Sequence, residues 1–263
     1  MTQTPANMGT DIMRFARLDM HEVEEFRIEG RALAVDHLRG RDGAVRAGAL
    51  LTMLDSAGGV CGGLASLPDG WVVSTNLSAR TVSRAPTGPL RIDARLLRKG
   101  RNNVVTSVEI ADAASGRAVM NGVLTSAVLV PENGPPVWNR PLRIGYPDEN
   151  DVDYLPMERW LDHRIVSALA VEMDLRDTLR NPWGILHGGV TAALVDAAAE
   201  HATGGGITTD MVLHYLAPNR VGPVRATASV LGSRSDGTVL RVEIADIGTA
   251  RVTAVAVVTV SSA

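Results

Sequence analysis

Residues 181–196 read Asn-Pro-Trp-Gly-Ile-Leu-His-Gly-Gly-Val-Thr-Ala-Ala-Leu-Val-Asp. The stretch opens with turn-forming residues and continues as an alanine-rich apolar run, which stops at three glycines at 204–206. Because alanine and leucine favour helix and consecutive glycines end one, we expect a helix from about Gly188 to about Thr203. The free N–H groups in the first turn of such a helix bind anions and polarised oxygens.

Asp196 lies on this expected helix, nine residues after His187. Nine residues at about 1.5 Å and about 100° per residue correspond to about 13.5 Å and roughly half a rotation. The helix start and this carboxylate therefore cannot act together on one small group. If both take part in chemistry, each needs a partner from a second copy of the motif.

The first half of the chain contains such a copy. The pentapeptide Val-Glu-Ile-Ala-Asp occurs at residues 108–112 and again at 242–246, a shift of 134 residues (242 − 108). Further upstream the shift is 141 residues (187 − 46), which aligns Arg46 with His187. A local match can arise by chance, but collinear matches across a whole domain indicate gene duplication.

Each repeat predicts the same elements: a strand, a loop, one central helix and four further strands. In the first repeat we expect a strand over Glu22–Asp36 with a break at Gly30, and a helix that contains Asp55. Glycines weaken the end of that helix, at positions 58, 59, 62 and 63. Four strands are expected at about 71–84, 89–98, 103–112 and 117–130.

The predicted fold class is α+β, with two domains that each wrap an antiparallel sheet around a central helix and together form an intramolecular pseudo-dimer. The expected organisation is an N-terminal extension at 1–20, a first domain at 21–132, a proline-rich linker at 133–160 and a second domain at 161–263. Three large aromatic residues suggest that the linker is packed rather than free: Trp138, Tyr154 and Trp160.

The composition sets further limits on function. The chain has 263 residues, 45% of them hydrophobic, and a net charge of −3, which argues against a general nucleic-acid or membrane partner. The only cysteine, Cys61, excludes an internal disulfide and suits a reducing compartment. No signal peptide and no apolar stretch long enough to span a bilayer are evident, so we expect a cytoplasmic protein. The six histidines lack the spacing of zinc ligands.

Three motifs in the second half resemble those of the hotdog-fold acyl-CoA thioesterases. They are Asn-x-x-Gly-x-x-His-Gly-Gly from residue 181, Leu-x-Asp ending at 196, and Thr-Asp-Met-x-x-x-Tyr-x-x-Pro from residue 209 followed by Gly-Pro. The pattern is most similar to the phenylacetic-acid-degradation (PaaI-like) type, a relative of 4-hydroxybenzoyl-CoA thioesterase. The resemblance covers 164–262 well, and 22–130 through the internal repeat. It implies hydrolysis of an acyl-CoA thioester without a metal or redox cofactor, and it leaves the acyl group undefined.

In that family the active sites lie between two hotdog units. One unit gives an Asn and a glycine amide that polarise the thioester carbonyl; the other gives a helix carboxylate, as general base or nucleophile, and often a Ser or Thr. The resemblance therefore implies two composite sites. The first site consists of Asn181, His187, Gly188, Asp55 and Ser74. The second site consists of Gly40, Arg46, Ala47, Asp196 and Thr208. Because arginine is bulky and always protonated, we expect the first site to be active and the second to be weak or inactive.

Some of these residues also fit structural roles. His187 could fix the loop through hydrogen bonds to its backbone, Asn181 precedes a proline and could form a turn, and Ser74 could be only a strand residue. The candidates for substrate binding are Gly189, Arg84, Arg98, Lys99 and Arg220. Basic loops bind the phosphates of CoA, although residues 98–101 also fit a solvated hairpin turn. The residues expected to shape the pocket are Trp183, Met53, Met211 and the linker.

Three functions compete on the sequence alone. The first is an acyl-CoA thioesterase, and the second is a non-catalytic acyl-CoA-binding or sensor protein. The third, a hotdog hydratase, typically carries an Asp and a His a few residues apart in one loop, which this sequence lacks. Acyl-CoA is the expected partner, with no nucleic acid and no membrane. Because hotdog units usually associate further, we also expect a dimer or trimer of these double-hotdog chains.

Overall fold

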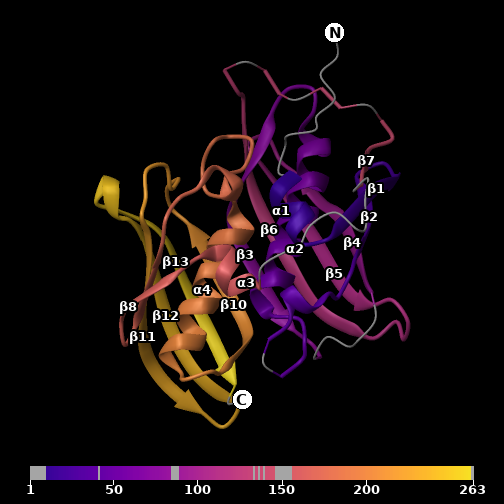
Figure 1. Ribbon diagram of the computed structural model, residues 1–263. Coiled ribbons are helices and arrows are strands. Elements are labelled where there is room, and N and C mark those ends of the chain that lie inside the picture. The colour runs from indigo at the N-terminus through magenta and orange to yellow at the C-terminus, as the bar shows by residue number, and fades with distance from the viewer. Residues whose placement is uncertain are drawn as a thin grey trace.

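The computed structural model describes residues 10–40, 42–83, 89–132, 134–135, 137–138, 140–145 and 156–261. Thirteen antiparallel strands form one continuous sheet, and two long helices pack against it (Figure 1). These helices, α2 (Ala47–Ser66) and α4 (Gly188–Ala202), contact each other in the middle of the molecule. The α+β double-hotdog architecture that the repeat predicts is confirmed.

The two halves of the chain share two strands, a short 3-10 helix, a long helix and four further strands in the same order, and differ in that only the first has α1 and only the second has η3. In the first half α2 is preceded by α1 (Thr10–Phe15), β1 (Leu18–Glu24), β2 (Arg27–Ala32) and η1 (Asp36–Leu38), and followed by β3 (Trp71–Thr81), β4 (Leu90–Lys99), β5 (Asn103–Asp112) and β6 (Ala118–Leu129). In the second half α4 is preceded by β8 (Arg164–Ser167), β9 (Ala170–Met173) and η2 (Asp177–Leu179), and followed by β10 (Ile207–Tyr215), β11 (Val224–Arg234), β12 (Gly237–Asp246), η3 (Ile247–Thr249) and β13 (Arg251–Ser261).

The sheet is symmetric about its centre. Its strand order is β7-β1-β2-β4-β5-β6-β3-β10-β13-β12-β11-β9-β8, so six strands of each half follow the same sequence outward from the β3–β10 pair, and β7 is added at one edge. These two strands pair antiparallel from Asp210 opposite Arg80 to His214 opposite Asn76, which joins the halves through backbone hydrogen bonds. The duplication in the sequence therefore appears as a pseudo-dimer within one chain.

Helix α2 continues to Ser66 through the four glycines that were expected to weaken its end. A Cβ atom added at Gly58 would lie 2.9 Å from Oγ1 of Thr106, and one at Gly62 would lie 2.9 Å from a methyl group of Val104. The glycines thus allow the helix to lie close against the sheet. By length and composition α2 could cross a membrane, contrary to expectation, but 94% of its most apolar window is buried inside the protein.

The N-terminal region also differs from expectation. The stretch Glu22–Asp36, predicted as one strand, contains the end of β1, a turn and the whole of β2. These two strands form a hairpin that starts at Leu18. Gly30 lies within β2 rather than at a break, since a Cβ there would lie 2.9 Å from the carbonyl oxygen of Asp19 on β1. Within the stretch expected to be an extension, α1 buries Phe15 completely in the core.

The linker packs against the first half of the molecule. Its short strand β7 (Arg143–Ile144) pairs with β1, and its helix α3 (Met157–Leu161) precedes β8. The indole of Trp138 meets Trp71 edge-on at 4.6 Å between ring centroids, and Trp160 stacks on Phe15 at 3.8 Å. The expectation of packing is confirmed for these two tryptophans, and Tyr154 lies outside the described residues.

Candidate active site

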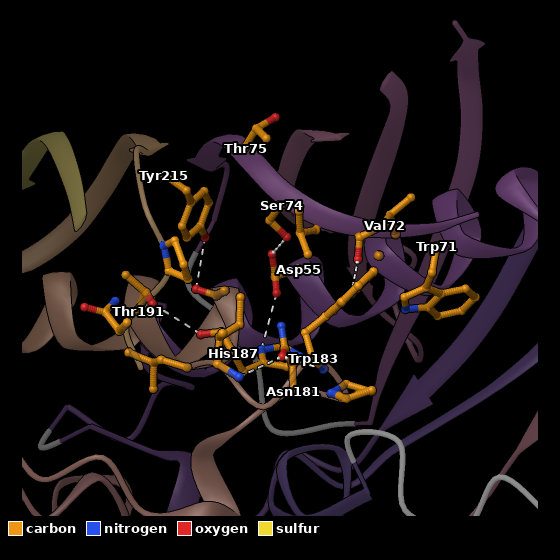
Figure 2. Close-up of a pocket in the computed structure, with 18 of the residues that line it drawn as sticks. Asp55, Trp71, Val72, Ser74, Thr75, Asn181, Trp183, His187, Thr191 and Tyr215 are labelled. Atoms are coloured by element: carbon orange, nitrogen blue, oxygen red, sulfur yellow. Dashed lines mark hydrogen bonds and ion pairs between the residues drawn. The ribbon is translucent and has the colours of Figure 1, made fainter. Parts of the chain in front are cut away.

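A pocket of about 300 Å³ lies between the two halves of the chain. Its walls come from α2, the start of β3, the loop before α4, the first turn of α4 and the loop after β10. All five residues of the first site line this pocket (Figure 2): Asn181, His187, Gly188, Asp55 and Ser74. The structure therefore brings these residues together around one cavity.

Asp55 projects from α2 toward the start of α4 and is only 4% exposed. Its Oδ2 accepts a hydrogen bond of 2.8 Å from the N–H of Gly189, and its Oδ1 accepts one of 2.7 Å from the hydroxyl of Ser74. A Cβ at Gly189 would lie 2.6 Å from the Cα of Thr52, so glycine permits this close approach of the helices. The carboxylate thus lies at the positive end of the α4 dipole, held by two donors.

Gly188 is the first residue of α4, so its N–H has no acceptor within the helix. Within the part of the chain that the structure describes, no other group accepts a hydrogen bond from it. A Cβ added at Gly188 would lie 2.6 Å from Oδ1 of Asp55, so a larger residue here would require the carboxylate to shift. The site therefore combines an unpaired N–H donor with an adjacent carboxylate.

His187 caps the N-terminus of α4. Its Nδ1 accepts a hydrogen bond of 3.0 Å from Gly189 N–H and lies 3.3 Å from Oδ2 of Asp55. Burial lowers the pKa of His187, and the neighbouring charge of Asp55 offsets this only in part. The imidazole is therefore neutral at neutral pH, with its proton on Nε2. The structural role that the sequence left open for His187 is the one its contacts support.

Asn181 forms the turn before α4. Its side-chain Oδ1 accepts hydrogen bonds from the N–H groups of Trp183 at 3.0 Å and Ile185 at 3.3 Å. The loop is further tied to β3, because the indole N–H of Trp183 donates to the carbonyl oxygen of Val72 at 3.0 Å (Figure 2). The Nδ2 group of Asn181 has no acceptor among the described residues, although the side chain lines the pocket. Asn181 is thus both a turn former and an available donor.

Some pocket residues were missed or misplaced by the sequence reasoning. Tyr215 belongs to the motif that starts at residue 209, but no function was predicted for it. Its hydroxyl donates a hydrogen bond of 2.9 Å to the carbonyl oxygen of Gly188 and fixes the first turn of α4. Trp183 lines the pocket as expected, and Trp138 does so from the linker. Met53 and Met211 do not line it, because they are buried in the core at 0% and 1% exposure.

The second site has the same backbone arrangement. The N–H of Gly48 donates to Oδ2 of Asp196 at 2.8 Å, matching the bond between Gly189 and Asp55. Burial raises the pKa of Asp196. Ala47 is the first residue of α2, and the N–H of Gly40, the counterpart of Asn181, donates to a backbone carbonyl of its own loop at 2.8 Å.

Among the described residues, the second site retains little space for a substrate. The guanidinium of Arg46 binds Glu200 at 2.8 Å and also Glu158 on α3, and its side chain is only 10% exposed. The cavity that remains has about 10 Å³ and is lined by Thr208 and Ala47 among others. That volume is close to the minimum for one water molecule. The bulk of arginine fills the position that His187 leaves open in the first site.

Residues 179–261 match the family model described as "Acyl-CoA thioesterase N-terminal domain". The whole fold is similar to the 12:0-ACP thioesterase from Umbellularia californica, at 10% identity, a TM-score of 0.64, and coverage of 91% of this chain and 98% of that one. It is also similar to the tesB protein of Mycobacterium avium subspecies paratuberculosis, at 12% identity, a TM-score of 0.61, and coverage of 96% and 98%.

A third solved structure is the acyl-ACP thioesterase from Bacteroides thetaiotaomicron, at 12% identity, a TM-score of 0.61, and coverage of 90% of this chain and 98% of that one. The chain is a tandem hotdog protein. Its likeness to these structures spans both halves, so the pairing of two hotdog units in one chain is shared with them. No curated protein sequence matches this tandem hotdog protein, and the PaaI-like subtype stays a prediction.

The basic candidates for substrate binding lie in different places on the tandem hotdog protein. Arg220 lines the pocket and is exposed, whereas Arg98 and Lys99 lie at the exposed end of β4. With strands β5 and β6 in between, β4 lies about 14 Å from β3 at about 4.8 Å per strand. Arg84 lies outside the described residues. The N–H of Gly189 is already bound to Asp55, so this glycine holds the two helices together.

Cys61 does not contribute a nucleophile. Its thiol lies on the buried side of α2 and donates to the carbonyl oxygen of Phe26 at 3.1 Å. Burial raises the pKa of this thiol to about 12. A thiolate is the reactive form of cysteine, so the residue is a core side chain.

Proposed function

We propose that this protein hydrolyses acyl thioesters to a carboxylic acid and a free thiol at the first site, with acyl-CoA as the substrate. The observation that carries the proposal is the contact between Asp55 on one helix and the start of the other, beside the unpaired N–H of Gly188, in an accessible pocket. The family match over 179–261 supports CoA as the carrier. Three structural relatives are named as thioesterases or as a tesB protein.

In the proposed reaction the thioester carbonyl oxygen accepts hydrogen bonds from the N–H of Gly188 and from Nδ2 of Asn181. Negative charge develops on this oxygen during attack, and the start of α4 stabilises it. In other enzymes, removal of one such donor raises the barrier by about 2.7–4 kcal/mol. Tyr215 fixes the first turn of α4 through the carbonyl of Gly188, and thereby positions the donor.

Asp55 acts as the general base in this scheme. Each of its oxygens holds one protein hydrogen bond, from Ser74 and from Gly189, so the carboxylate is fixed while one lone pair on each oxygen remains. A water molecule between Asp55 and the carbonyl carbon loses a proton to Asp55 as its oxygen attacks. The tetrahedral intermediate then expels the thiolate, which takes up the proton.

The first experiment measures free thiol released from a panel of acyl-CoAs by the purified protein. Asp55→Asn should lower kcat by about 10²–10⁴-fold, the usual contribution of a general base. Tight binding of acyl-CoA without turnover by the natural protein would contradict the proposal and favour a non-catalytic acyl-CoA-binding or sensor protein.

A second experiment separates a general base from a nucleophile. In a single turnover in ¹⁸O-labelled water, a general base delivers the label directly into the carboxylic acid product. A nucleophilic Asp55 would form an anhydride, and attack of water on its aspartyl carbonyl would place the label in the Asp55 side chain and leave the product acid unlabelled. Mass spectrometry of the product acid and of the peptide that contains Asp55 distinguishes the two mechanisms.

We further propose that the chains associate into dimers or trimers in a reducing, cytoplasmic compartment. The single buried thiol of Cys61 fits such a compartment. Light scattering of the purified protein tests the association, and a mass equal to one chain would rule it out.

A further inference from the structure

One glycine of α2 has no role in packing against the sheet. Gly59 follows Asp55 by four residues, which places both on the same face of the helix, and it lines the pocket. A Cβ added at Gly59 meets no atom within 4 Å, whereas at Gly58 and Gly62 it would lie 2.9 Å from strand side chains. The space above Gly59 is therefore part of the pocket.

The internal repeat supplies a counterpart for this position. Gly59 corresponds to Glu200, because 200 − 59 gives the same shift of 141 residues that relates Asp55 to Asp196. The Oε2 atom of Glu200 accepts the hydrogen bond from Arg46 that closes the second site. The second site, which has the Glu200 side chain at this position, retains a cavity of about 10 Å³. The first site, which has Gly59 there, has a pocket of about 300 Å³.

The wall next to Gly59 is apolar. Val60 follows it on α2, and the indole rings of Trp71 and Trp138 meet edge-on, all three lining the pocket. Figure 2 shows Trp71 and Tyr215 on opposite sides of Asp55, so the Trp71 side of the pocket extends away from the first turn of α4. Besides the neutral His187, the ionisable side chains among the lining residues are Asp55, Tyr215, whose pKa is raised further by burial, and the exposed Arg220.

We propose that Gly59 sets the depth of the acyl-binding part of the pocket, and that the acyl group is apolar and extends from Asp55 past Gly59 toward Trp71 and Trp138. This inference rests on the proposed function. A volume of about 300 Å³ is at the lower end for small-molecule sites, and the pocket must also hold the thioester end of the carrier. The class of acyl group that fits is a medium aliphatic chain or an arylacyl group, such as octanoyl or phenylacetyl, and a palmitoyl chain is too long.

The test compares the specificity of the natural protein with that of Gly59→Ala and Gly59→Leu. The substrates are butanoyl-CoA, octanoyl-CoA, phenylacetyl-CoA and palmitoyl-CoA. The natural protein should prefer octanoyl or phenylacetyl over palmitoyl. Gly59→Leu should lower the ratio of kcat/KM for octanoyl to that for butanoyl by about tenfold or more, with a smaller shift in the same direction for Gly59→Ala.

Gly232→Ala is the matched control. Gly232 lies on β11 outside the pocket, is exposed, and an added Cβ there also meets no atom within 4 Å. Its acyl-chain profile should equal that of the natural protein. Circular dichroism of all variants establishes that they are folded.

Binding gives a readout that does not depend on turnover. Because Trp71, Trp138 and Trp183 line the pocket, S-octyl-CoA, a thioether that cannot be hydrolysed, should change the tryptophan fluorescence of the natural protein but not of Gly59→Leu. If no thioester is hydrolysed but this difference is seen, the proposed function fails while the role of Gly59 stands. If Gly59→Leu matches the natural protein in both readouts, the role of Gly59 is overturned. Absence of both hydrolysis and binding in the natural protein overturns both proposals.

Discussion

The first and second sites share one backbone arrangement and differ in the side chains that surround it. In each, an aspartate from one helix accepts a 2.8 Å hydrogen bond from the glycine at the second position of the other helix. The first site opens into a pocket of about 300 Å³, whereas the second retains about 10 Å³. The aspartate–amide bond persists where no substrate can enter, so it holds the two helices together whether or not chemistry takes place.

The bond between an aspartate and a helix start does not by itself distinguish an active site from an inactive one. An aspartate at a helix start is expected in either site, because a buried N–H needs an acceptor and a helix start attracts a negative charge. The differences that bear on the space in the first site include the neutral His187 in place of Arg46, and Gly59 in place of Glu200. Variants of both sites test whether these side-chain differences make the first site active and the second inactive.

The largest expected difference is between Asp55→Ala and Asp196→Ala. Asp55→Ala should reduce thioester hydrolysis to background, whereas Asp196→Ala should leave kcat/KM within a few-fold of the natural value. Asp196→Ala leaves the buried N–H of Gly48 without its acceptor, and Asp55→Ala removes the shorter of the two hydrogen bonds that the N–H of Gly189 donates. Each should lower the free energy of unfolding by about 1–3 kcal/mol. Kinetics and urea unfolding of both variants measure the two effects. Loss of activity in Asp196→Ala alone would reverse the assignment of the sites.

A smaller loss of activity is expected for Asn181→Asp. The aspartate keeps an oxygen for the N–H groups of Trp183 and Ile185, but it lacks the Nδ2 donor and places a negative charge beside the carbonyl. We expect kcat to fall by about 10²–10³-fold, corresponding to about 2.7–4 kcal/mol, with little change in Tm. The matched variant Asn181→Ala loses the turn as well, so its Tm should also fall. Full activity in Asn181→Asp would limit Asn181 to a turn-forming role.

The sequence predicted the repeated helices and strands because their signals are local. The glycine pair at the start of α4, the alanine-rich run and the strand patterns all act within one element. The repeat showed that each helix needs a partner from the other half of the chain, and the resemblance to the hotdog thioesterases implied that Asp55 lies near Gly188. The closing of the second site was harder to foresee: Glu158 reaches Arg46 from the linker, 112 positions away in the chain. Most of strand β1 was missed because only Leu18 and Met20 of its seven residues are buried, which makes the apolar alternation short.

The two repeats also differ in the hydrogen bonds of the aspartate that ends the repeated pentapeptide, Asp112 in the first and Asp246 in the second. This difference predicts an effect of pH on stability. Asp246 is completely buried and accepts N–H bonds from Arg220, Val221 and Gly222, which line or adjoin the pocket. Burial acts to raise the pKa of Asp246, but these bonds outweigh it and the net pKa is lowered. A lowered pKa in the folded state contributes stability above the unfolded value of about 4, which is lost as the pH falls through the folded value.

Asp246→Asn should therefore lower the free energy of unfolding at pH 7 by about 1–3 kcal/mol and weaken its dependence on pH below about 4. Among the described residues, the counterpart Asp112 accepts hydrogen bonds from the backbone and side chain of Ser115. Asp112→Asn should thus have the smaller effect. Urea unfolding at pH 7 and pH 4 measures both, and equal effects would show that the pocket loop is not specially dependent on Asp246.

The smallest expected effect concerns the stability of the two helices at positions 59 and 200. Gly59→Ala adds a methyl group that contacts nothing, so it should raise the free energy of unfolding by about 0.5–1 kcal/mol through helix propensity alone. Glu200→Gly does the reverse, and in addition it leaves Arg46 without one of its two carboxylate partners. Its loss should therefore exceed the gain at position 59, as measured by urea unfolding of both variants. A destabilising Gly59→Ala would mean that the space above this glycine is already filled, and that the openness of the first site has another origin.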